Sequence, residues 1–182
     1  MRWTSLFADL EAQFEAAEAA ELAAEVRDRS RREAGLVRAV DRLRASQGAP
    51  LSVSVLGAGS VPGVLLDAGE DWLLLEETGR REVLVPLAAV LGVAGLGRRT
   101  QVQEGEVARR LDLRWALRGL ARGRTAVQLV LRDGSGLTGT LDRVGADHVD
   151  LAEHVAGELR RPGAVQGVRL LPLSALALVR QG

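Results

Sequence analysis

Apolar and polar residues alternate in two separate stretches of the chain, and each stretch predicts a meander of short β-strands. Turns rich in glycine and aspartate separate the apolar runs, as at residues 57–59 and 67–71. The predicted strands cover residues 51–55, 64–66, 73–75 and 83–85 in the first stretch, and 127–131, 137–141, 149–151, 168–171 and 175–179 in the second.

A helical period governs the regions between and before these stretches. Leu6, Leu10 and Phe14 stand four apart and predict one face of a helix within the first 34 residues, and a short amphipathic helix follows Gly35. The region 97–123 predicts a helical connector. The N-terminal helices either pack on the strands or form a dimerising hairpin, and the pattern allows both.

The two strand-rich stretches are copies of one sequence. Five residues recur 76 positions later, and after a longer loop in the second copy three more recur 86 positions later. The matches are Gly63, Gly69, Asp71, Leu75 and Glu77 with Gly139, Gly145, Asp147, Leu151 and Glu153, then Pro86, Leu87 and Ala89 with Pro172, Leu173 and Ala175. A duplicated small fold therefore organises the chain.

Composition narrows the class of protein. The 182 residues include no cysteine, which excludes disulfides and thiolate metal sites. All 24 basic residues are arginine, which indicates a bacterial host of high GC content. The formal net charge is zero, yet the connector at residues 97–125 holds eight arginines against three acids. We find neither a signal peptide nor an apolar run long enough to span a bilayer, and we expect a cytoplasmic protein with no membrane association.

The stretch from Val127 to Leu141 resembles the first signature of the Sm-like family, which includes the bacterial Sm-like RNA chaperones. Asp133 and Gly134 suit a tight hairpin turn, and Gly139 allows the following strand to bend. The resemblance implies a small five-stranded barrel of the Sm-like or SH3-like type, and the repeat extends it to the first copy. It also implies side-by-side assembly through edge strands, and hence a possible homo-oligomer.

The predicted fold is therefore α+β, with two tandem Sm-like or SH3-like small β-barrels, an N-terminal helical segment and a helical connector. The expected parts are N-terminal helices at 1–49, a first barrel at 50–96, a basic helical connector at 97–125 and a second barrel at 126–182.

We expect a non-catalytic regulatory or adaptor protein associated with nucleic acid, RNA rather than DNA. Sm-like RNA chaperones bind uridines in the turn between their last two strands, but here that turn reads Leu171-Pro172-Leu173 and lacks their polar and basic groups. The connector arginines are the expected phosphate contacts, with a second basic run at Arg27, Arg29, Arg31 and Arg32. The candidate site comprises Arg98, Arg99, Arg109, Arg110, Arg114, Arg118 and Arg122.

A protein-interaction scaffold is the alternative from another class. In that case the N-terminal helices and the barrel edges recruit partner proteins, and the arginines form internal salt bridges. Trp3 and Trp115 are expected to be packing anchors in either case.

Two further motifs have simpler interpretations, and we expect no cofactor and no metal. The stretch 53–63 contains a glycine-rich run after a strand, but Pro62 stands where a dinucleotide-binding loop needs its third glycine. A possible metal cluster or enzyme site comprises Asp147, His148, Asp150, Glu153 and His154. Its Asp147 and Glu153 recur in the first copy without a histidine, which favours structural roles at a turn and a strand end.

Overall fold

The computed structural model describes residues 3–101, 111–155 and 165–181, with side chains from residue 11 onward. The chain divides into two compact units, Met1–Arg38 and Ala39–Gly182. The first unit contains the helix α1, Trp3–Leu36, close to the predicted end at residue 34. Its described side chains are exposed, including the apolar Phe14, Leu22 and Val26. In the described part of the chain, no helix combines the length and apolarity needed to cross a membrane.

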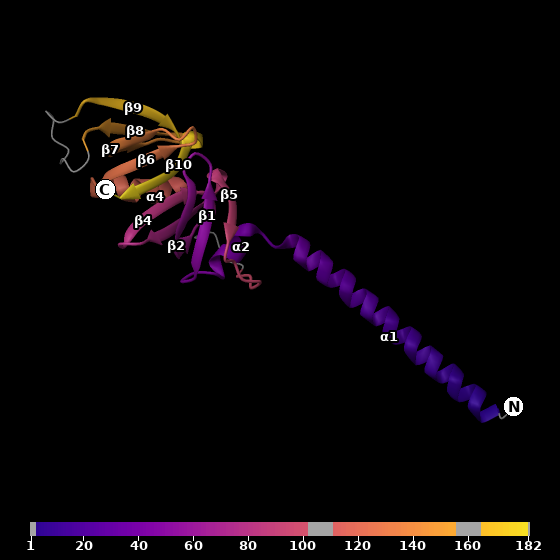
Figure 1. The fold of residues 1–182 in the computed structure, drawn as a ribbon. Helices are drawn as coiled ribbons and strands as arrows, with labels where there is room; N and C mark the ends of the chain where they lie inside the picture. Colours follow the sequence, from indigo (N-terminus) through magenta and orange to yellow (C-terminus); the bar gives the residue numbers. More distant parts are fainter. Residues whose placement is uncertain (1–2, 102–110, 156–164, 182) are drawn as a thin grey trace. The chain divides into compact units, whose positions relative to one another are not determined.

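The ten described strands of the second unit form one antiparallel sheet in the order β5-β1-β2-β3-β4-β10-β6-β7-β8-β9 (Figure 1). Each repeat contributes five neighbouring strands. The strands of the first repeat are β1 Pro50–Val55, β2 Gly59–Ala68, β3 Trp72–Glu77, β4 Arg81–Pro86 and β5 Val90–Ala94. The strands of the second are β6 Ala126–Leu131, β7 Gly136–Val144, β8 His148–Glu153, β9 Gly167–Pro172 and β10 Leu176–Gln181.

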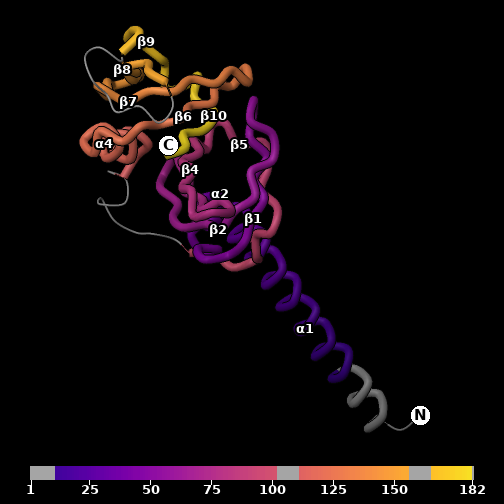
Figure 2. Tube along the Cα trace, turned by 60° about the vertical axis from the view of Figure 1, so that its left-hand side comes forward, coloured from indigo at the N-terminus to yellow at the C-terminus, as the bar shows by residue number. Residues whose placement is uncertain are grey.

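The two repeats are joined in a single sheet that is not closed, whereas the sequence predicted two barrels. The join is the antiparallel pair of β4 and β10 (Figure 2). In this pair Val179 lies opposite Leu84 and Arg180 lies opposite Val83. Backbone groups at a strand edge are satisfied by pairing with another strand, and the covalent link between the repeats keeps such a partner close. The α+β class is confirmed, and the two repeats of the chain pair with each other through β4 and β10.

The repeat is reproduced in the backbone hydrogen bonds. Each half closes the turn before its third strand in the same way and connects that turn to a short 3-10 helix, η1 Leu87–Ala89 or η2 Leu173–Ala175. The equivalent bonds are Gly69 N to Trp72 O (2.9 Å) and Gly145 N to His148 O (2.8 Å), then Leu87 N to Asp71 O (2.8 Å) and Leu173 N to Asp147 O (2.7 Å). The two copies therefore share a local fold as well as a sequence.

The repeated glycines at 63 and 139 are required by close backbone approach. A Cβ atom on Gly63 would lie 2.7 Å from the carbonyl oxygen of Glu76, and one on Gly139 would collide with the carbonyl oxygen of Ala152. Both glycines thus allow a long, bent strand to approach its neighbour, β3 in one half and β8 in the other.

The hydrophobic core consists of two clusters, one for each half, and the halves exchange residues between them. Ala177 and Leu178 of β10 belong to the cluster of the first half. Trp72 of β3 and Leu84 of β4 belong to the cluster of the second half. Neither repeat therefore completes its core alone.

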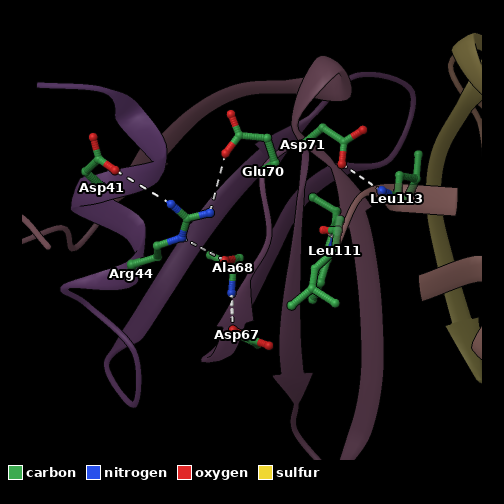
Figure 3. A network of polar contacts seen from close by, with 9 residues as sticks. Asp41, Arg44, Asp67, Ala68, Glu70, Asp71, Leu111 and Leu113 are labelled. Atoms are coloured by element: carbon green, nitrogen blue, oxygen red, sulfur yellow. Dashed lines mark hydrogen bonds and ion pairs between the residues drawn. The ribbon is translucent and has the colours of Figure 1, made fainter. Parts of the chain in front are cut away.

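The helix α2, Ala39–Arg44, packs on the first half through the buried Leu43. Arg44 is itself buried and is held by three oxygen partners (Figure 3). Its Nε donates to the Ala68 carbonyl at 3.2 Å, and its other nitrogens lie 3.7 Å from the Asp41 carboxylate and 3.6 Å from that of Glu70.

The helix α4, Leu113–Gly123, covers part of the second half, with Leu113 and Leu117 buried. The sequence predicted that the connector helix begins near Gly97, but this described helix begins at Leu113. Its start is fixed by the first half, because the Asp71 carboxylate accepts the Leu113 N–H at 2.7 Å (Figure 3). The Trp72 indole also donates to the Leu111 carbonyl at 2.8 Å.

Candidate nucleic-acid interface

The helix α4 presents one basic and aromatic side to solvent. Its buried side is fixed by Leu113 and Leu117, so Trp115, Arg118 and Arg122, spaced three and four residues apart, fall together on another side. Trp115, Arg118 and Arg122 are all exposed. The register of the apolar residues therefore determines which side chains can meet a ligand.

Asp112 fixes the first turn of α4 as its N-cap. Its carboxylate accepts the Trp115 N–H at 2.8 Å and the Arg114 Nε–H at 2.7 Å. Burial alone raises the pKa of Asp112, but these hydrogen bonds outweigh it and hold the pKa below its ordinary value. In contrast, burial raises the pKa of Asp71 above the ordinary value despite its hydrogen bond from Leu113.

A hollow of about 490 Å³ lies between α4 and β7, and we call it the basic groove. It holds four arginines and one carboxylate. The lining residues are Trp115, Arg118, Ala121, Arg122, Arg124, Asp142, Arg143 and Val144.

The charges in the basic groove are only partly balanced. Arg124, the C-cap of α4, donates to the Asp142 carboxylate at 3.2 Å. Arg118, Arg122 and Arg143 form no ion pair with any residue that the structure describes. Within the described part of the chain, three guanidinium groups of the groove therefore have no carboxylate at ion-pair distance, and guanidinium groups form strong hydrogen bonds with anionic oxygens.

Trp115 lines both the basic groove and an apolar hollow of about 340 Å³. Its side chain is 48% exposed, so the sequence-based expectation of a packing anchor describes it only in part. The apolar hollow is lined mainly by the side chains of Trp72, Leu74, Leu84, Trp115, Leu120 and Val179, with Asp67, Glu82 and Gln181 among its polar residues. An aromatic surface thus lies directly beside the arginines that form no ion pair with a described residue.

The predicted site residues fall in different places. Arg118 and Arg122 line the basic groove, whereas Arg114 is engaged by Asp112 and supports the cap. Arg98 and Arg99 are exposed in an irregular segment after β5 and do not line the groove. The predicted residues Arg109 and Arg110 lie outside the described residues.

Sequence reasoning missed Arg124 and Arg143 as members of the groove. The register of β7 against β8 shifts between Leu141 and Arg143, and this bulge re-aims the strand at the point where it lines the groove. The repeat offered one signal, since Arg143 occupies the position of Asp67 in the first copy. The side chain at this position is therefore acidic in the first copy and basic in the second.

The histidine cluster is not assembled as a metal site. His148 is bonded to Asp147 at 2.9 Å, while the buried His154 is 2.8 Å from the Thr140 hydroxyl. Across residues 3–101, 111–155 and 165–181, no group of three or more histidine or acidic residues is arranged to hold a metal ion. The two imidazoles are tied into separate structural contacts.

No known protein family matches the chain, and no curated protein matches it either.

Proposed function

We propose that this protein is a non-catalytic, nucleic-acid-associated regulatory or adaptor protein that binds RNA in the basic groove. The observation that supports it is a set of three arginines, Arg118, Arg122 and Arg143, that form no ion pair with a described residue and line the groove together with the half-exposed Trp115.

The chemistry of the groove suits a single strand. Guanidinium groups neutralise phosphates and release counterions, which supplies affinity without reading the sequence. An exposed indole can stack on a nucleic-acid base only when that base is not already stacked between its neighbours in a duplex. Phosphate contacts and one stacked base together favour single-stranded RNA over duplex DNA.

The proposal includes an Sm-like identity for each half of the sheet. Two features of the second half support it, namely the hairpin turn at Asp133 and Gly134, where Gly134 has a φ of 87°, and the bent strand at Gly139. A third is that each half contains five described strands. In this scheme the sheet is a rigid support, and α4 carries the ligand-binding side chains.

The test replaces Arg118, Arg122 and Arg143 together by Gln. Binding of labelled single-stranded RNA is measured by fluorescence anisotropy over a range of salt concentrations, with labelled duplex DNA in parallel. We expect affinity at near-physiological salt to fall by about tenfold or more, and the slope of log affinity against log salt to fall by about 2.

The control replaces Arg27, Arg31 and Arg32 of α1 by Gln, which removes the same charge from an exposed helix surface. This control should keep wild-type affinity. Loss of binding in the control with retention in the groove variant would place the contact on α1 and contradict the proposal. Wild-type protein that binds neither probe at low salt would favour the protein-interaction scaffold.

A further inference from the structure

The apolar hollow lies between α4 and the strands β2, β3, β4 and β10. Its volume of about 340 Å³ falls within the range of small-molecule sites in proteins, which is about 300–1,000 Å³. The proposed phosphate contacts lie in the basic groove, and Trp115 is the residue that the two hollows share. The apolar hollow is therefore a concave surface to which the proposed function assigns no ligand.

The strand side of the hollow is apolar and fixed in position. Leu84 and Val179 are buried where β4 pairs with β10. Trp72 is also buried, and its indole N–H donates to the Leu111 carbonyl at 2.8 Å. A Cβ atom on Gly69 would collide with this indole, so the glycine gives the ring its place. A ligand would therefore meet a preformed apolar wall.

Gly119 keeps the hollow open on the helix side. It lies in the interior of α4, where glycine stabilises a helix less than alanine does. Apart from its neighbours in the helix, no described atom lies within 4 Å of the position that a Cβ atom on Gly119 would take. A side chain here would occupy part of the hollow, so the glycine leaves this space empty at a cost in helix stability.

The charged groups of the hollow have one sign. They are the carboxylates of Asp67 and Glu82, and none of the described arginines lines the hollow. Asp67 accepts the Ala68 N–H at 2.8 Å, and Glu82 lies 3.5 Å from the side-chain amide of Gln181. Neither carboxylate forms an ion pair with a residue that the structure describes. The hollow therefore favours positive charge.

We infer that the apolar hollow binds a small organic cation, an amine or quaternary ammonium compound with an apolar body. The buried side chains of the wall contact the body, and the two carboxylates attract the charged group. Indole rings attract cations at their faces, and both Trp72 and Trp115 line the hollow. This inference goes beyond RNA binding and does not depend on it.

The experiment is isothermal titration calorimetry of the full chain without nucleic acid. Three probes share one phenylbutyl group and differ in charge, namely 4-phenylbutylammonium, 4-phenylbutan-1-ol and 5-phenylpentanoate. We expect the ammonium compound to bind about tenfold or more tightly than the alcohol and the carboxylate. A variant with Asp67→Asn and Glu82→Gln keeps an oxygen acceptor at both positions. It should bind the ammonium compound about tenfold more weakly and the alcohol as the wild type does.

Gly119→Leu tests the location of the site. Leucine favours a helix more than glycine does, so this variant should melt at or above the wild-type temperature. Its side chain should fill the hollow and abolish binding of the ammonium compound. Gly35→Leu is the matched control, because Gly35 also lies in a helix, α1, with no described atom near its Cβ position. This control should keep wild-type affinity.

Four results would overturn the inference. They are no binding of the ammonium compound at millimolar concentration, equal affinity for all three probes, binding that persists in a folded Gly119→Leu, and self-association of the wild type that Gly119→Leu abolishes. The last result, seen by sedimentation velocity, would mean that a second copy fills the hollow. If Gly119→Leu melts below the wild type, the variant with Asp67→Asn and Glu82→Gln decides, and unchanged affinity for the ammonium compound then overturns the inference.

Discussion

At the scale of single residues, Trp115 is the side chain that distinguishes the proposed RNA-binding surface from an ordinary cluster of exposed arginines. It is half exposed although it lies on a helix with two buried leucines, and it borders both the basic groove and the apolar hollow. Its substitution should therefore affect stacking without changing the charge of the groove.

We expect Trp115→Ala to weaken binding of single-stranded RNA by about tenfold, because stacking on an aromatic side chain stabilises each bound base. The salt dependence should stay at its wild-type slope, since no phosphate contact is removed. Binding of duplex DNA should hardly change, because its bases are already stacked. Anisotropy titrations with both probes check this, and Trp115→Phe should recover much of the loss. An equal loss for both probes would contradict a stacking role.

At the scale of the element, the N-terminus of α4 depends on carboxylates from two sources. Asp112 caps the helix from its own segment, and Asp71 reaches it from the first half of the sheet. The Asp112 contact is local, whereas the Asp71 contact ties the helix to the repeat that precedes it.

We expect Asp112→Ala to lower the free energy of unfolding by about 1 kcal/mol at neutral pH, because the Trp115 N–H loses its partner. The pKa of Asp112 in the fold lies below the ordinary value of 3.8. Its contribution is therefore complete above that value and is lost as the pH falls through the lower folded value.

The measurement is urea denaturation of wild type and Asp112→Ala at several pH values from 7 down to 3. The difference between the two proteins should stay constant down to about pH 5 and then shrink. Asp71 acts with the opposite sign, because burial raises its pKa and its protonation favours the fold. Asp71 is present in both proteins, so its effect cancels when the free energies of unfolding of wild type and Asp112→Ala are subtracted. A difference in free energy that persists unchanged at pH 3 would contradict the role assigned to Asp112.

At the scale of the whole molecule, the exchange of core residues makes the two halves depend on each other. Leu178 belongs to the second repeat in sequence and to the core of the first half in space. We expect Leu178→Ala to lower the free energy of unfolding by about 3 kcal/mol, as for other leucines truncated in a core. Both halves should still unfold in one transition.

Urea denaturation followed by circular dichroism and by Trp72 fluorescence, in a Trp3→Phe and Trp115→Phe background, checks this prediction. Trp72 reports on the core of the second half, where Leu178 makes no contribution. Coincident curves with a shared loss of stability support a single cooperative unit. Leu56→Ala, at an exposed turn position, should change stability by less than about 0.5 kcal/mol. Two separate transitions would show that the halves fold independently.

The sequence alone determined the local elements and the duplication. Strand alternation, the turn at Gly134 and the glycine at 139 depend on neighbouring residues, and each is found as predicted. The strand β5 was not predicted separately, although the offset from β10 could have revealed it.

Only the tertiary structure decided how the two copies join and where the basic groove lies. The pairing of β4 with β10 depends on strands about a hundred residues apart, and hydrophobic alternation is the same for either neighbour. Arg143 joins Arg118 and Arg122 because a bulge in β7 meets a helix whose first residue is held by Asp71. A linear pattern records which residues favour a strand or helix, but the partner of each edge and face is chosen by packing across the whole chain.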